Sequence, residues 1–209
     1  MPAPETPSRT GRPAGGEPRT VRTREALESG LWELLRDHEL SDISVAALCR
    51  QAGVHRTTFY GHHRSIFDFA ASFYAGAVDK LGAVDVDLDG AGLSREEVSI
   101  LYVDAVRHIL RHIRSERRVY RALFSTGSFP GVLAGGLRCR FRLALDVWDA
   151  HGLVPGLDLD TVAAFLGGAY ASWFEQWASG EDDDVEAQLA SLPHLLPPWW
   201  PRDGFPGAA

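Results

Sequence analysis

The chain has 209 residues, of which 45% are hydrophobic, so it is long enough for one or two domains with a substantial core. Its 21 basic and 28 acidic residues give a net charge of −7, which excludes a uniformly basic nucleic-acid coat. The acids are unevenly placed, because none occurs from Ile43 to Phe67, where Arg50, Arg56 and Arg64 stand. The sequence therefore predicts a local positive face on an acidic protein.

The first 20 residues contain five prolines, three glycines and almost no apolar side chain. We expect a disordered arm here, with no secretory signal, whose arginines are either solvated or in reach of a phosphate or a minor groove. The longest apolar run, Val162–Phe174, has 13 residues, too few for the about 20 that a membrane span needs. Cys49 and Cys139 each fall in an apolar helical pattern, so we expect two buried, reduced thiols. A soluble cytoplasmic protein without a membrane association follows.

Leucines at helical spacing predict a first helix from about Thr23 to Asp37. Ser44 is a suitable N-cap for a second, short helix that ends at Gly53, and a third helix follows at once. Two short helices joined by a turn that contains glycine form the pattern of a helix-turn-helix DNA-binding domain. We assign this domain to residues 21–66.

From Gly53 to His63 the sequence reads GVHRTTFYGHH, whose three histidines suit either a metal site or a DNA-binding surface. His55 and His62 lie about two helical turns apart, roughly 10 Å along a helix axis, so they do not lie close enough to share a metal. No cysteine or acid nearby completes a tetrahedral site. The sequence therefore favours DNA binding over metal binding in this segment.

On the third helix, Phe59 and His63 are expected to face the preceding helices, while Arg56, Thr57 and Tyr60 point outward. Arginine offers two donors to guanine, threonine offers a hydroxyl and a methyl group, and tyrosine offers a hydroxyl to phosphate. We therefore predict that the outer side reads DNA. The alternative is a packing unit of helix-turn-helix shape without a DNA role.

Residues 44–63, SVAALCRQAGVHRTTFYGHH, resemble the N-terminal DNA-binding domain of the tetracycline-repressor (TetR) family, and the likeness extends over about residues 23–70. The resemblance rests on Ser44, on Ala52-Gly53-Val54, and on Thr58-Phe59-Tyr60 with His62. It implies base-edge contacts from Arg56 and Thr57, with Tyr60 as a further candidate. It also implies phosphate contacts from Ser44, Thr58, Tyr60 and His62.

The sequence departs from the family pattern at the end of this segment. Members usually carry a lysine at the start of the fourth helix, where this chain has Ile66. Arg64, two residues earlier, is a candidate substitute for that phosphate contact. His63 replaces the usual aromatic residue, and the glycine common at the end of the first helix is absent. These changes affect the expected contact geometry more than the fold.

The rest of the chain resembles the family only in architecture, which implies a helical ligand-binding and dimerisation domain over residues 67–196. Periodicity predicts helices over about 65–81, 94–114, 116–126, 130–151, 159–179 and 184–193. Ser94 and Glu97 form a capping-box pattern, and no segment alternates with a period of two, so we predict an all-α fold. The tail, residues 197–209, is too rich in proline for a helix, although Trp199 and Trp200 are able to pack onto the body.

His108 and His112 stand one helical turn apart, a spacing that suits two metal ligands. It equally suits two polar residues on the wall of a pocket or in solvent, and we favour this interpretation. No Ser-His-Asp, paired-carboxylate or Cys-His arrangement stands out, so we predict no catalytic residues and no cofactor.

The predicted helix over 159–179 combines small residues, which admit a second backbone, with broad tryptophans. This pattern fits a dimer interface, and burial within one subunit is the alternative. The expected interface residues are Gly167, Gly168, Ala171 and Trp173. Aromatic residues on other helices either line a ligand pocket or belong to the ordinary core. These candidates are Tyr102, Tyr120, Phe141, Trp148 and Tyr170.

Together these features predict a homodimeric transcriptional regulator that binds a double-stranded DNA operator. We expect a repressor that an unknown small-molecule effector releases from DNA. One alternative is a helical enzyme that acts on a small molecule in the C-terminal domain. A second alternative is a DNA-binding dimer with a filled core and no effector.

Overall fold

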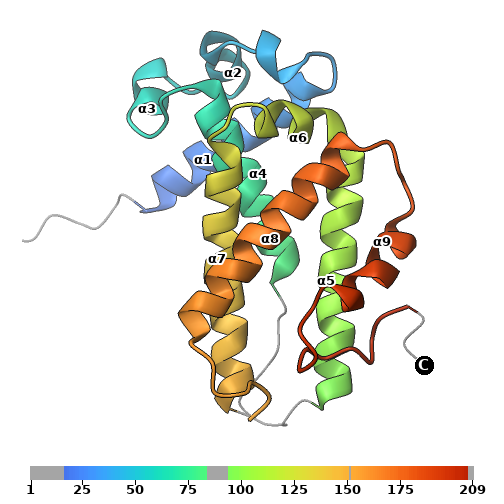
Figure 1. The fold of residues 1–209 in the computed structure, drawn as a ribbon. Helices are drawn as coiled ribbons and strands as arrows, with labels where there is room; N and C mark the ends of the chain where they lie inside the picture. The colour runs from blue at the N-terminus through green and yellow to red at the C-terminus, as the bar shows by residue number, and fades with distance from the viewer. Residues whose placement is uncertain (1–16, 84–93, 151, 207–209) are drawn as a thin grey trace, which may run out of the picture.

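The computed structural model describes residues 17–83, 94–150 and 152–206, and Figure 1 shows them as a bundle of helices. All regular structure in these residues is helical, which confirms the predicted all-α class. In chain order the elements are α1 (Glu17–Leu35), η1 (Leu40–Asp42), α2 (Val45–Gln51), α3 (Arg56–Tyr60), α4 (Ile66–Gly82), α5 (Arg95–Ser115), α6 (Arg117–Phe124), α7 (Phe129–Ala150), α8 (Leu159–Ser179), α9 (Val185–Ser191) and η2 (Leu192–His194).

The first helix begins earlier than the sequence pattern indicated, at Glu17 instead of about Thr23. The prediction of a disordered arm over residues 1–20 is therefore wrong for residues 17–20, and residues 1–16 lie outside the described part of the chain. Proline is tolerated in the first turn of a helix, where the N–H groups have no intrahelical acceptor. Pro18 is for that reason compatible with a helix that starts at Glu17.

Serine hydroxyls cap α2, α4 and α5, because each accepts a hydrogen bond from the backbone N–H three residues further on. The distances are 3.1 Å for Ser44, 3.1 Å for Ser65 and 3.2 Å for Ser94. The Glu97 carboxylate also accepts the Ser94 N–H at 2.8 Å, which confirms the predicted capping box. Gly53 follows α2 with a φ of 64°, a left-handed conformation that strains other residues, so the turn before α3 requires glycine.

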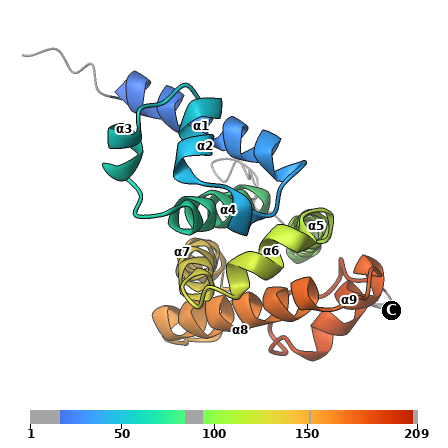
Figure 2. The same cartoon turned by 90° about the horizontal axis from the view of Figure 1, so that it is seen from above.

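Leu31 of α1, Leu48 of α2 and Phe59 of α3 are fully buried and form one small core. Phe69 of α4 extends this core, with its ring centroid 5.9 Å from that of Phe59. Figure 2 shows the consequence from above: α1, α2 and α3 lie together on one side, and α4 lies between them and the remaining helices. α4 is therefore the element that connects the first three helices to the rest of the protein.

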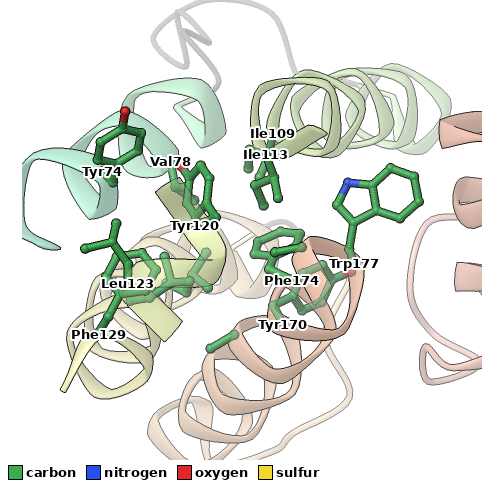
Figure 3. Packing of buried hydrophobic residues seen from close by; sticks show 14 of the residues in the cluster. Tyr74, Val78, Ile109, Ile113, Tyr120, Leu123, Phe129, Tyr170, Phe174 and Trp177 are labelled. Atoms are coloured by element: carbon green, nitrogen blue, oxygen red, sulfur yellow. The ribbon is translucent and has the colours of Figure 1, made fainter. Parts of the chain in front are cut away.

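The remaining helices enclose a larger core rich in aromatic side chains (Figure 3). Tyr74 of α4 lies edge-on to Tyr120 of α6, with ring centroids 5.2 Å apart, and Phe129 of α7 lies 6.0 Å from Tyr120. On the other side of this core, Phe174 of α8 is fully buried, and the Trp177 indole N–H donates to the Leu110 carbonyl at 3.0 Å. Tyr120 thus joins α4, α6 and α7 at the centre of the bundle.

α7 and α8 form an antiparallel pair, visible at the front of Figure 1. The two backbones approach most closely at Gly167, where an added Cβ would lie 2.8 Å from the carbonyl oxygen of Ala134 and from the N of Arg138. Gly168, the next residue, has no atom within 4 Å of the corresponding position. The two adjacent glycines therefore have different roles, since one permits packing within the protomer and the other faces outward.

The tail after η2 folds back onto the body, as expected for Trp199 and Trp200. Trp200 is only 1% exposed, and Trp199 packs partly buried against the core. Arg95, at the start of α5, donates to the carbonyl oxygens of Trp199 at 2.8 Å and Trp200 at 3.3 Å. The tail thus follows a defined path along the first half of α5.

Candidate functional site

The residues predicted to contact DNA all have exposed side chains, and they gather around α2, α3 and the turn before α4. They are Ser44, Arg56, Thr57, Thr58, Tyr60, His62 and Arg64. Tyr60 is 58% exposed although it is a large aromatic residue. Leaving its apolar ring in water is unfavourable, and contact with a partner surface would cover it. Ser44 differs from the others, because its hydroxyl already caps α2 through the Ala47 N–H.

α3 is held in place by the side opposite to its exposed residues. Phe59 is fully buried, and its ring lies 5.6 Å from that of His63 and 5.9 Å from that of Phe69. The expectation that Phe59 and His63 face inward is therefore correct. Because α3 has only five residues, this anchoring, and not helix propensity, fixes the direction of its outer side.

The electrostatics of this face are positive. The side chains of Arg50, Arg56 and Arg64 are exposed, and none forms an ion pair with a residue in the described ranges. A guanidinium without an ion-pair partner keeps its full charge for a phosphate. The acid-free segment of the sequence thus becomes a surface that suits an anionic partner.

The first acid after this segment of the sequence, Asp68, is already engaged at the start of α4. Its carboxylate accepts the Arg64 N–H at 3.0 Å and lies 3.7 Å from Nδ1 of His63. Burial lowers the pKa of His63, and the nearby Asp68 carboxylate opposes this shift. His63 is therefore a neutral packing residue near pH 7 and does not add to the positive charge.

Ile66 is buried at the first position of α4, where the TetR pattern has a lysine. An isoleucine side chain in the core supplies no cation, so the start of α4 lacks this phosphate contact. Arg64 is exposed two residues earlier and is the cation nearest in sequence. The geometry thus supports Arg64 as the substitute that the sequence indicated.

The histidines whose spacing in the sequence suits metal ligands do not lie together in the structure. His55 and His62 are exposed, and within the described ranges no group of three or more His, Cys, Asp or Glu residues is arranged to hold a metal ion. His108 is exposed on α5, whereas His112 turns inward and stacks on Tyr74 with ring centroids 6.2 Å apart. The two residues of this pair therefore have different environments.

His112 belongs to a polar cluster inside the bundle that sequence reasoning did not find. The Tyr74 hydroxyl donates to Glu116 Oε2 at 3.4 Å, while His112 Nε2 and the Tyr120 hydroxyl are buried without a hydrogen-bond partner. Burial lowers the pKa of His112 and raises those of Tyr74, Tyr120 and Glu116. No sequence signal relates these residues, because three different helices bring them together.

Besides α4 itself, the side chain of Arg118 ties the end of the first helix to the C-terminal helices. Arg118 of α6 donates to the carbonyl oxygens of Leu35 at 3.2 Å and His38 at 3.4 Å, and its Nε lies 3.0 Å from Glu39 Oε1. A cavity of about 220 Å³ lies at the same junction. Its lining residues are Trp32, Leu35, Arg36, Ser115, Glu116, Arg118 and Val119. A shift of α6 would therefore displace the end of α1 through these contacts.

The aromatic residues predicted to line a pocket fall into two groups. Tyr120 belongs to the cluster with Tyr74 and His112. The other four residues come from α5, α7 and α8: Tyr102, Phe141 and Trp148 pack against the indole of Trp200, and Tyr170 packs against Phe141. Trp200 was not among the predicted pocket residues, because nothing in the sequence indicates where an irregular tail will pack.

The predicted dimer interface needs correction at two residues. Gly167 and Ala171 are buried inside the protomer, so they pack α8 within its own subunit and are not available to a partner. Trp173 is half-buried, with its ring 5.5 Å from that of Phe174. Gly168 is exposed as expected. Small residues on more than one side of α8 explain the error, since periodicity alone does not tell which side faces a partner.

The exposed sides of α7 and α8 are nonetheless unusually apolar. Leu143 is 62% exposed and Phe165 is 71% exposed, and Val132 is exposed as well. The exposed, uncharged residues of α7 include Gly131, Val132, Gly135, Cys139 and Leu143, and from Val132 onward they follow at intervals of three or four. Those of α8 include Thr161, Ala164, Phe165, Gly168, Ser172 and Gln176. We call these exposed, uncharged residues of the two adjoining helices the α7–α8 face; the exposed Arg138 and the Arg142–Asp160 ion pair lie on the same two helices.

One of the two cysteines also differs from expectation. Cys49 is buried, and burial raises the pKa of its thiol, as expected for an inert residue of the core. Cys139 is exposed, so the prediction of a second buried thiol is wrong. Cys139 lies on the exposed side of α7, although its apolar sequence neighbours Leu137 and Phe141 are buried in the core.

The fold is a three-helix unit with a helix-turn-helix, a connecting fourth helix and a helical C-terminal domain, and it is similar to that of solved structures. The structure of RolR without ligand superposes with a TM-score of 0.58 at 18% sequence identity, covering 84% of this chain and 89% of RolR. The chain is also similar to Lin0861 from Listeria innocua, with a TM-score of 0.49, 20% identity, and coverage of 88% of this chain and 97% of that one.

A third similar structure is the TetR family repressor AlkX from Dietzia sp. strain DQ12-45-1b, with a TM-score of 0.39 and 14% identity. It covers 75% of this chain and 97% of AlkX. No protein-family model and no curated protein matches the sequence. Among the described helices, none has the length and apolarity required to cross a bilayer.

Proposed function

We propose that the protein is a homodimeric transcriptional regulator that binds operator DNA through α3 and releases it when a small molecule binds to the C-terminal domain. The observation that carries the proposal is the arrangement of α3. Its outer side presents Arg56, Thr57 and Tyr60 to solvent, with no acid in the sequence from Ile43 to Phe67. A short helix anchored by one buried phenylalanine and open on its other side suits insertion into a major groove.

The residues divide by the kind of contact that their chemistry permits. Arg56 and Thr57 stand at the start of α3, where the end of a recognition helix meets base edges, and a guanidinium suits guanine O6 and N7. Thr58, Tyr60, His62 and Arg64 supply hydroxyl, imidazole and guanidinium groups for phosphates. The Ser44 hydroxyl, which caps α2, is able to accept its intrahelical bond and still donate to a phosphate.

The α7–α8 face is the proposed dimer interface. Exposed Val132, Leu143 and Phe165 would be costly to leave in water, and Gly168 would allow a partner helix to approach closely. Two helices from each subunit would then form a four-helix interface about a two-fold axis. Such a dimer presents two copies of α3, as a palindromic operator with half-sites about 34–36 Å apart requires.

The proposed regulation acts through the position of α3. α4 joins the first three helices to the rest of the protein, and Arg118 attaches α6 to the end of α1. A ligand that binds the C-terminal domain better in one arrangement of α4 and α6 would shift the population away from the DNA-binding spacing. Repression follows if the unliganded state is the one that binds DNA.

The test begins with duplexes enriched from a random library by the purified protein. Arg56→Ala should weaken binding to an enriched duplex by about 1–3 kcal/mol, which is about 5- to 150-fold, and relax the sequence preference at one base pair per half-site. Arg111→Ala is the matched control, because Arg111 lies on α5 and pairs with Glu186 of α9 at 3.5 Å. Equal affinities for wild type and Arg56→Ala would show that α3 does not read DNA as proposed.

A further inference from the structure

Aromatic residues of α5 and α7 pack around a side chain from the protein's own tail, and an aromatic residue of α8 packs behind them. Trp200 packs edge-on against Trp148 with ring centroids 4.7 Å apart, against Tyr102 at 5.1 Å, and against Phe141 at 6.1 Å. Tyr170 closes the group, since its ring lies 5.0 Å from Phe141 and its hydroxyl hydrogen-bonds to that of Tyr102. We call the space enclosed by these four side chains the aromatic chamber.

The indole is held in the aromatic chamber by packing of the rings and makes no hydrogen bond there. Trp200 is almost fully buried, yet its Nε1 finds no hydrogen-bond acceptor. A buried N–H without a partner is unfavourable compared with one in water. A separate molecule of similar shape could fill the same space and also use the Tyr102 and Tyr170 hydroxyls, so the tail is a replaceable occupant.

The tail that carries Trp200 is attached to α5 by buried side chains, among them Phe205 with its ring 5.9 Å from that of Tyr102, and by hydrogen bonds. It is not helical, and apart from its buried side chains it is held to α5 by two kinds of hydrogen bond. Arg95 donates to the carbonyl oxygens of Trp199 and Trp200, and the Gly204 N–H donates to the buried Ser99 hydroxyl at 2.8 Å.

Gly204 lies so close to α5 that an added Cβ would be 2.6 Å from the Ile100 N. The docked path is therefore specific, because only glycine fits at this contact. It is also peripheral, since Figure 1 shows the tail beside the first half of α5 and next to α9, outside the helices themselves. Undocking would expose the aromatic chamber and leave the helices in place.

We propose that the aromatic chamber is a binding site for an uncharged, planar aromatic compound of about the size of indole, and that Trp200 occupies it as a tethered competitor. The side chains around the indole supply aromatic faces and two tyrosine hydroxyls and carry no charge, which selects a neutral ring with a hydrogen-bonding group. Binding of such a compound displaces residues 199–206. The effect of this displacement on DNA affinity rests on the proposed function, whereas the binding site does not.

A tethered competitor weakens the apparent affinity of the free compound by the fraction of molecules in which the chamber is open. If the tail is undocked in about one molecule in ten, the apparent affinity falls about tenfold. Trp200→Ala removes the competitor and should therefore bind the compound at least about tenfold more tightly than wild type. Trp199→Ala is the matched control, because the neighbouring tryptophan does not enter the chamber and its removal leaves Trp200 in place.

The test uses indole as the probe and hydrogen exchange, read by mass spectrometry, on the full-length wild-type chain. Saturating indole should accelerate exchange of the amides of residues 199–206, the Gly204 N–H among them, while α5, α7 and α8 exchange no faster. Indole-3-acetate, the charged counterpart, should act more weakly. Calorimetry on wild type, Trp200→Ala and Trp199→Ala then gives the predicted order of affinities. Unchanged exchange of the tail at saturating indole, or no binding of indole to wild type, would show that Trp200 is an ordinary core residue.

A DNA-binding measurement separates this inference from the proposed function. Faster tail exchange together with a changed affinity for an enriched duplex supports both the site and its regulatory role. Faster tail exchange without a change in DNA affinity supports the aromatic chamber as a ligand site but overturns its role as the effector site. The wild-type exchange experiment needs no substitution, so it remains decisive even if Trp200→Ala fails to fold.

Discussion

Arg118 of α6 donates to the backbone carbonyl of Leu35, the last residue of α1, at 3.2 Å. The same guanidinium donates to the His38 carbonyl and pairs with Glu39, so one side chain from the C-terminal domain caps the end of the first helix. Carbonyls at the end of a helix have no intrahelical donor, and a cation there also interacts favourably with the helix dipole. This contact gives α6 a direct connection to the helices that position α3.

Replacing Arg118 should loosen the end of α1 without unfolding the protein. Because the side chain is more than half exposed, we expect Arg118→Ala to cost only about 1 kcal/mol. Hydrogen exchange over residues 33–43 should accelerate, while exchange in α8 stays as in wild type. Arg114→Ala is the control, since Arg114 donates to the Asp183 carbonyl before α9 and should leave residues 33–43 unaffected. Equal exchange in the two variants would argue against the connection.

DNA binding should depend strongly on salt even though the protein carries a net charge of −7. The exposed arginines of the first three helices neutralise phosphates and release their counterions. A plot of log K against log salt concentration should therefore have a slope of about −0.9 for each phosphate neutralised. Arg64→Ala should reduce the slope by about one phosphate if Arg64 replaces the lysine that is absent at Ile66. A slope near zero for wild type would mean that this face does not meet DNA.

The adjacent glycines of α8 give a matched pair of substitutions for the dimer. A Cβ at Gly168 has no atom of its own protomer within 4 Å, so leucine there should mainly overpack the proposed interface and weaken dimerisation by about 1–3 kcal/mol, or about 5- to 150-fold. Gly167→Ala instead forces α8 away from α7 and should lower the thermal stability of each subunit. Sedimentation measures the first effect and thermal unfolding the second.

The exposed Cys139 reports on the same interface. Its thiol should react slowly with a maleimide in the wild-type dimer and faster in Gly168→Leu, whereas the buried Cys49 stays protected in both proteins. A wild-type protein that sediments as a monomer at micromolar concentration would contradict the α7–α8 face as the interface. So would a Gly168→Leu variant that dimerises as tightly as wild type.

His112 should make stability depend on pH in the weakly acidic range. Burial among Tyr74, Tyr120 and Glu116 lowers its pKa below the ordinary value of 6.5, so the unfolded chain binds a proton more readily than the folded one. The folded protein is then most stable above pH 6.5 and loses this stability as the pH falls through that value. The raised pKa of Glu116 acts in the opposite sense at lower pH.

The measurement is the thermal midpoint between about pH 7.5 and 5.5, in wild type and two variants. His112→Gln should flatten the dependence, and the exposed His108→Gln should not. If both variants keep the wild-type slope, His112 is not responsible for it.

The local features of this protein could be predicted from its sequence, because they depend on near neighbours. Ser44 and Ser94 cap their helices as expected, Gly53 takes the left-handed turn, and Phe59 lies under the exposed side of α3. The candidate DNA surface follows from these features, since α1 and two short helices that share one core leave few alternative arrangements.

The errors concern contacts between residues far apart in the chain. Whether Gly167 or Gly168 faces a partner depends on the rotation of α8 against α7, and a helix with small residues on several sides does not specify it. The position of Trp200 depends on where an irregular tail crosses α5. The cluster around His112 requires three helices to be placed first. Each of these features is a matter of tertiary packing, about which periodicity says little.

The central claim, that two copies of α3 read one operator, is tested most directly by the sequences that the wild-type protein enriches from a random duplex library. The account predicts an inverted repeat whose half-site centres lie about one helical turn apart, or a small multiple of it, and two chains bound per duplex at saturation. Enrichment of a single unrepeated site by one chain, or no enrichment at low salt, would contradict the claim.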